Sequence, residues 1–150
     1  MSDITTIWST ALCSADWAVS GAMLTSGQDL ESALIISVFS DRVAGPDDVI
    51  PDGTDNPRGW CLDDSGWPIG SRMWLLQRAK QVPETARRAR DYIIEAIQWL
   101  IDDKVVARFD VSVQWIAAGQ LGAQITAYMQ DGGTTSKISK RFLWAWNGVT

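Results

Sequence analysis

An alternation of apolar and polar residues between Val105 and Trp115 constrains the fold of this chain more than any other feature. The apolar positions are Val105, Ala107, Phe109, Val111, Val113 and Trp115. Because successive side chains of a strand point to opposite faces, the pattern predicts a β-strand with one buried face. The same alternation returns from Leu121 to Met129 after the short AAGQ segment, so the two segments are predicted to form an antiparallel hairpin.

A long amphipathic helix is predicted immediately before this hairpin, from Glu84 to Asp103. Pro83 favours a helix start at this position. Tyr92 and Trp99 lie off the apolar stripe, so a surface besides the sheet is expected to cover part of the helix. The predicted fold class is α+β, with a small antiparallel sheet packed on this helix. The core-facing stripe consists of Ala86, Ala89, Ile93, Ala96, Ile97 and Leu100.

The first forty residues are less clearly patterned, although a length of 150 residues suits one domain. Residues 1 to 14 are predicted to form an arm, and Asp16 to Leu24 alternates loosely, as in an edge strand. Leu30 to Phe39 is apolar enough to be buried, and its periodicity leaves open both a buried helix and a buried strand. Ser26 and Asp29 can supply oxygen acceptors to a helix start.

A loop rich in proline, glycine and aspartate is predicted from Val43 to Gly70. Loops of this length inside a compact domain are usually functional or disordered. The indoles of Trp60 and Trp67 argue against disorder, because exposed disordered segments contain few aromatic residues. The loop is therefore predicted to pack partly against another subunit, with a local core beneath the loop as the alternative.

A short helix is predicted from Arg72 to Lys80, with Ser71 as its cap. Trp74 precedes Arg78 by one helical turn, so the indole and the guanidinium group can stack. Both lie off the apolar face. Tryptophan and arginine dominate protein–protein hot spots, which makes this helix a candidate interface.

The C-terminal segment is predicted to consist of a flexible tether from Asp131 to Lys137 and a strand from Arg141 to Asn147. Phe142, Trp144 and Trp146 fall on one face of this strand. The strand either forms the third strand of the hairpin sheet or pairs with a neighbouring protein by β-augmentation. An unpaired aromatic strand would aggregate, so it must pair in one of these ways.

The composition excludes several classes of function. The chain has no histidine, which removes the commonest general base and metal ligand. A net charge of −5 argues against nucleic-acid binding, which requires a field of lysine and arginine. No apolar run approaches the ~20 residues that span a bilayer, and no export signal is visible, so no membrane partner is predicted. Cys13 and Cys61 are predicted to be free thiols.

Carboxylates are the remaining candidates for chemistry. Asp63 and Asp64 could in principle hydrolyse a glycoside as a pair, but acidic pairs in loops more often form turns. The acidic loop also lacks a calcium motif, because Ile50 and Gly59 stand where ligands are needed. No catalytic, cofactor or metal site is predicted, and the chain is not expected to be an enzyme.

One long stretch resembles the Mu-like phage baseplate protein family, which belongs with the sheath-initiator and baseplate-wedge proteins of contractile tails. It reads LESALIISVFSDRVAGPDDVIPDGTDNPRGWCLDDSGWPIGSRMWLLQRAK and is followed by a helix that ends EAIQWLIDDKVVARFDV. The resemblance covers Asp29 to Trp146. It implies a structural role in the virion tail baseplate, assembled in the host bacterial cytoplasm, with wedge proteins, hub or tube proteins and the tail sheath as partners.

Within this resemblance, the C-terminal segment is the candidate for initiating the sheath by strand exchange. A rival hypothesis is a tail module that binds carbohydrate or cell wall through the Trp-rich loop. The candidate interface residues are Trp60, Trp67, Arg72, Trp74, Arg78, Tyr92, Trp99, Phe142, Trp144 and Trp146.

Overall fold

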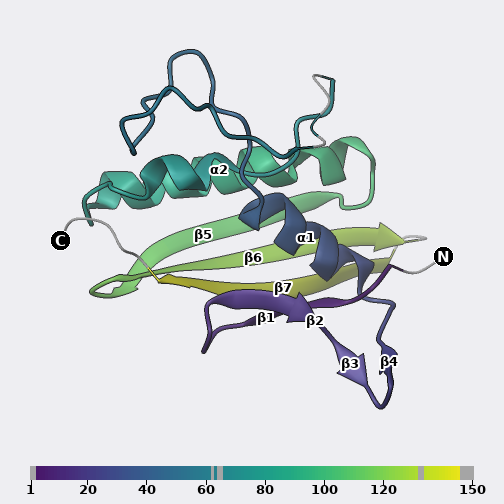
Figure 1. Ribbon diagram of the computed structural model, residues 1–150. Coiled ribbons are helices and arrows are strands. Elements are labelled where there is room, and N and C mark those ends of the chain that lie inside the picture. Colours follow the sequence, from purple (N-terminus) through teal and green to yellow (C-terminus); the bar gives the residue numbers. More distant parts are fainter. Residues whose placement is uncertain (1–2, 62, 64–65, 132–133, 146–150) are drawn as a thin grey trace.

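A computed structural model describes residues 3–61, 63, 66–131 and 134–145 of the chain. In this described part, a three-stranded antiparallel sheet of order β5-β6-β7 carries the helices α1 and α2 on one face (Figure 1). Side chains from both helices and all three strands form the main core. The predicted α+β class is confirmed. The bounds are α1 Asp29–Phe39, α2 Pro83–Asp102, β5 Arg108–Ala117, β6 Gln120–Asp131 and β7 Thr134–Ala145.

The predicted hairpin is confirmed by the pairing of β5 with β6, in which Val111 lies opposite Ile125. Both side chains are buried beneath the helices. The strand begins three residues later than the start of the alternation, because Lys104 takes a positive φ of 61° and turns the chain after α2. In this turn Val106 is buried and Val105 is exposed, which reverses the predicted orientation at these positions.

The two helices differ in how well their patterns predicted them. α2 matches the predicted helix, and its six stripe residues are all buried. α1 settles the ambiguity of Leu30 to Phe39 in favour of a helix. The predicted side-chain cap of α1 is wrong: the Asp29 carboxylate instead accepts a hydrogen bond from the Asp3 backbone N–H at 3.0 Å. Within the described residues, no helix is long and apolar enough to cross a bilayer.

The N-terminal segment differs from its prediction. Residues Thr6–Ser9 form strand β1, which pairs with β2 (Ser14–Trp17), so this part of the predicted arm is a hairpin. The edge strand predicted for Asp16 to Leu24 is divided among β2, β3 (Val19–Ser20) and β4 (Met23–Leu24). The side chain of Trp8 stacks on Phe39 of α1 with ring centroids 3.9 Å apart, which fastens β1 to the core.

The C-terminal strand β7 pairs with β6 along its whole length, from Thr134 opposite Asp131 to Ala145 opposite Gln120. The tether prediction is therefore wrong for residues 134–137, and the strand is the third strand of the sheet. Lys140 forms an ion pair with Glu31 of α1, which fastens the strand to the helical layer. Trp144 is a residue of β7 opposite Leu121, and Trp146 lies outside the described residues.

Gly70 closes the long loop against the end of α1, and we expect Gly70→Ala to destabilise the fold. Its φ of +99° is strained for other residues, and an added Cβ would lie 2.4 Å from the Ser40 carbonyl oxygen. That oxygen accepts the Ser71 backbone N–H, so it is not free to move. The expected loss in urea unfolding is about 2 kcal/mol or more.

Gly21→Ala is the matched control for this prediction. Gly21 also has a positive φ, but no atom lies within 4 Å of its added Cβ. Its loss should reflect backbone strain alone, about 1 kcal/mol. Equal losses at the two positions would contradict the close approach of Gly70 to α1.

Candidate interaction surface

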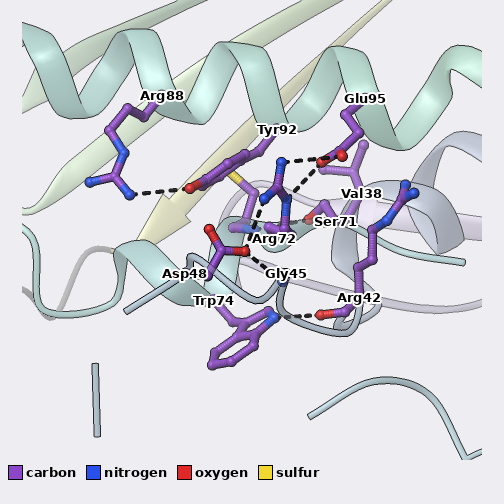
Figure 2. A network of polar contacts seen from close by, with 11 residues as sticks. Val38, Arg42, Gly45, Asp48, Ser71, Arg72, Trp74, Arg88, Tyr92 and Glu95 are labelled. Atoms are coloured by element: carbon purple, nitrogen blue, oxygen red, sulfur yellow. Dashed lines mark hydrogen bonds and ion pairs between the residues drawn. The ribbon is translucent and has the colours of Figure 1, made fainter. Parts of the chain in front are cut away.

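Arg72 lies at the centre of a polar network that fastens the long loop to α2 (Figure 2). Its Nη1 contacts the Asp48 carboxylate at 2.9 Å, and its Nε donates to the Glu95 carboxylate at 2.9 Å. The guanidinium carbon also lies 4.9 Å from the ring centroid of Tyr92. Asp48 additionally accepts the Gly45 backbone N–H at 2.8 Å. Arg72 and Tyr92, predicted as interface residues, therefore hold the chain together internally.

The electrostatics of this network favour its charged form. Burial raises the pKa of the Asp48 carboxyl, but hydrogen bonds from Arg72 and Gly45 together with the charge of Arg72 outweigh burial and lower it below its usual 3.8. Burial also lowers the pKa of Arg72, while Asp48 and Glu95 raise it by more. Asp48 and Arg72 are therefore both ionised at neutral pH.

Trp74 is buried rather than offered to a partner, which corrects its prediction as an interface residue. It belongs to the 3₁₀ helix η1 (Arg72–Leu76), which is shorter than the predicted helix, and Ser71 caps η1 as predicted. The indole N–H donates to the Arg42 carbonyl at 2.8 Å. The predicted stacking with Arg78 is wrong, since Arg58 from the loop lies 4.6 Å from the ring centroid instead. Trp74 thus supports the local-core alternative.

The role of Arg58 in packing the loop around Trp74 was not predicted from the sequence pattern. Its guanidinium group contacts Asp41 at 3.2 Å and Asp52 at 3.5 Å, and so links the segment after α1 to two parts of the loop beside Trp74. Arg58 lies sixteen positions before Trp74 in the numbering, so no helical spacing connects them. Only the path of the loop brings the two side chains together.

Three of the predicted interface tryptophans remain at the surface. The exposed fractions are 44% for Trp60, 73% for Trp67 and 41% for Trp99. Trp67 and Trp99 line a groove of about 790 Å³ between α1, α2 and the end of the loop, where Ile36 and Ile69 are also exposed. We call this region the α1–α2 groove. Trp60 is not among its lining residues.

Two carboxylates of the loop, Asp63 and Asp52, shape turns of its backbone. Asp63 accepts the Ile69 backbone N–H at 2.8 Å, which shapes the loop before the groove. Asp52 accepts the backbone N–H and the hydroxyl of Thr54. Asp64 lies outside the described residues. Within the described part, no three cysteine or acidic side chains are grouped so that they could hold a metal ion.

A second exposed apolar surface lies on the N-terminal hairpins, where β3 and β4 project from the body of the molecule (Figure 1). Trp17, Val19, Met23 and Leu24 are all exposed there. The sequence signal for this surface is the loose alternation of apolar and polar residues. The same alternation is also typical of an ordinary edge strand with one covered face. The pattern could not show that neither face of these strands is covered.

The comparisons with known proteins agree with the resemblance of the sequence. Residues 30–134 match the family described as Phage protein GP46. Baseplate protein gp46 of Escherichia phage Mu is 38% identical over 150 residues, which cover 99% of this chain and 100% of that protein. Mu-like prophage FluMu protein gp46 of Haemophilus influenzae is 33% identical over 140 residues, which cover 91% of this chain and 94% of that protein. The chain belongs to the phage Mu gp46 family, a family of structural baseplate proteins and not of enzymes.

Proposed function

We propose that this chain joins wedge proteins to the hub or tube in the baseplate of a Mu-like contractile tail, and that it starts assembly of the tail sheath. The observation that carries the proposal is the likeness to the Mu baseplate protein over the full length of that protein. The exposed tryptophans of the α1–α2 groove support it, because indoles at a protein surface are typical anchors between subunits.

The outer edge of β7 supports the proposed contact with the sheath. In the described part of the chain β7 pairs only with β6, so its other edge can accept a strand by β-augmentation. The exposed side chains of Lys137 and Arg141 place charge on this strand, and charged edge residues oppose self-pairing. We therefore propose that the sheath protein adds a strand at this edge, while β7 itself stays in the sheet.

Co-expression with the wedge, hub, tube and sheath proteins encoded beside this chain tests the proposal. We expect a wedge or hub protein to co-purify with the tagged chain at a defined stoichiometry in size-exclusion chromatography. Sheath protein added to that complex is expected to assemble on it and not on the chain alone. A folded, soluble chain that purifies without any of these proteins would contradict the proposed role.

A glycan-binding tail module is the second candidate, and the exposure of Trp60 and Trp67 on one loop favours it. A flat apolar ring with a polar N–H suits contact with a sugar ring. Titration of the chain with cell-wall glycan fragments, followed by tryptophan fluorescence, separates the candidates. The assembly role predicts no change in emission, whereas saturable quenching that Trp67→Ala removes would support the glycan-binding module.

A further inference from the structure

The α1–α2 groove has an apolar wall built by three separate segments. Ile36 comes from α1, Trp99 from α2, and Trp67 with Ile69 from the end of the loop. The Trp99 indole N–H donates to the Ser37 hydroxyl at 2.9 Å, which holds the ring in place. Rigid aromatic side chains bind at a smaller entropic cost than mobile ones. The wall is therefore suited to receive apolar side chains from another molecule.

The rim of this groove carries uncompensated negative charge. Asp3, Asp29, Asp102 and Asp103 line it, and none forms an ion pair within the described residues. Two of these carboxylates accept hydrogen bonds from uncharged donors, Asp102 from the Gln98 amide at 3.1 Å and Asp29 from the Asp3 backbone N–H at 3.0 Å. Glu95 also lines the groove, and it pairs with Arg72, a cation that it shares with Asp48. Arg42 is the one cation among the described lining residues, so the rim remains negative.

Two of these carboxylates occupy an unfavourable position on α2. Asp102 is the last helical residue and Asp103 is its cap, and the last turn contains no basic residue. The aligned peptide dipoles of a helix place partial negative charge at its C-terminus, so carboxylates at that end destabilise the helix of the isolated chain. A cation supplied by another molecule would remove this repulsion.

We propose that the α1–α2 groove binds a segment of a neighbouring baseplate protein in which apolar residues are flanked by lysine or arginine. The apolar residues would pack against Trp67, Trp99 and Ile36, and the basic residues would lie at the rim against Asp102 and Asp103. Complementary charge across an interface selects the partner and its orientation. This inference rests on the proposed baseplate function and adds to it the chemistry of the partner.

Trp67→Ala tests the apolar wall in the complex with the protein that co-purifies with the wild-type chain. Because Trp67 is largely exposed, we expect the variant to fold normally and the Kd to rise about tenfold. Trp17→Ala, which removes an exposed indole of β2 outside the groove, is the matched control and should leave the Kd within about twofold. An equal effect of both substitutions would overturn the proposal.

The double variant Asp102→Asn with Asp103→Asn tests the rim. We expect the Tm of the isolated chain to rise, because repulsion at the end of α2 is removed, while the Kd for the partner rises several-fold and depends less on salt concentration. Asp47→Asn with Asp55→Asn changes the net charge equally at exposed loop positions outside the groove. A Kd that changes equally in both double variants, or in neither, would contradict the proposal.

A photoreactive benzophenone amino acid in place of Trp67 identifies the occupant directly. Mass spectrometry of the cross-linked complex is expected to show a partner segment with apolar residues next to lysine or arginine, and an acidic segment would overturn the inference. A wild-type chain that co-purifies with no baseplate protein would contradict the proposed function itself. A wild-type complex that groove variants do not weaken would contradict only this inference.

Discussion

Replacing Phe142 by alanine is expected to lower the free energy of unfolding by about 3 to 5 kcal/mol. Phe142 is 1% exposed, and its ring lies edge-on to Trp8 and Phe39, with centroids 5.9 Å and 5.7 Å away. These three rings join β7, β1 and α1. Removing the central ring leaves a cavity at the place where the two ends of the described chain meet the helical layer.

Chemical denaturation followed by circular dichroism measures this loss, with Trp17→Ala as the control. The Trp17 side chain is mostly exposed, so its removal should change the free energy of unfolding by less than about 0.5 kcal/mol. A similar small change for Phe142→Ala would show that the aromatic cluster contributes little to the fold.

The position of Phe142 also bears on how the sheath contact is tested. Deleting residues 141–150 removes this core ring and several paired positions of β7, so the truncated chain is expected to unfold. Loss of sheath attachment in such a deletion variant would then reflect unfolding of the chain and not the loss of a specific contact with the sheath. Point substitutions at the exposed side chains of Lys137 and Arg141 probe the edge without this loss.

Replacing Arg72 by methionine is expected to lower the free energy of unfolding by about 2 kcal/mol. Methionine keeps an apolar stem but removes the cation that pairs with both Asp48 and Glu95. The loop would lose its anchor on α2, and its backbone amides should exchange faster with deuterium. Arg87→Met is the control, since its pair with Glu84 is exposed and should contribute less than about 0.5 kcal/mol.

The pH dependence of stability provides an independent test of the same network. The folded-state pKa of Asp48 is lowered, so its contribution is complete above the ordinary pKa of 3.8 and is lost as the pH falls through the folded-state value. Asp48→Asn should therefore be less stable than the wild type at pH 7, and the difference should shrink below pH 3.8. A difference that stays constant with pH would contradict an ionised pair of Asp48 with Arg72.

The regular elements with strong periodicity were predictable. The stripe of α2 and the alternations in β5 and β6 each repeat over nine or more residues, and their buried side chains belong to the two core clusters of the molecule. The apolar segment of α1 carries no such asymmetry, because it is apolar nearly all round. Its choice between helix and strand depends on the neighbours that cover it.

The candidate surface was less predictable than the fold. Trp67 and Trp74 lie in the same Trp-rich region, close to turn-forming residues. Trp74 is nevertheless buried, whereas Trp67 is exposed. The difference arises because Arg58 and the Arg42 carbonyl close over Trp74. Neither contact has a sequence spacing that a helix or strand pattern can reveal.

The sequence by itself determined the family, the α2 helix, the β5–β6 hairpin and the absence of histidine chemistry, because these depend on residue identity and on local repeats. Only the tertiary structure decided that β7 forms the third strand of the sheet, that β1 packs on α1 through Trp8, and that Trp67 and Trp99 border one groove. The physical reason is that exposure depends on which distant segments meet. A local pattern places a side chain on a face, and the packing of the chain decides whether anything covers that face.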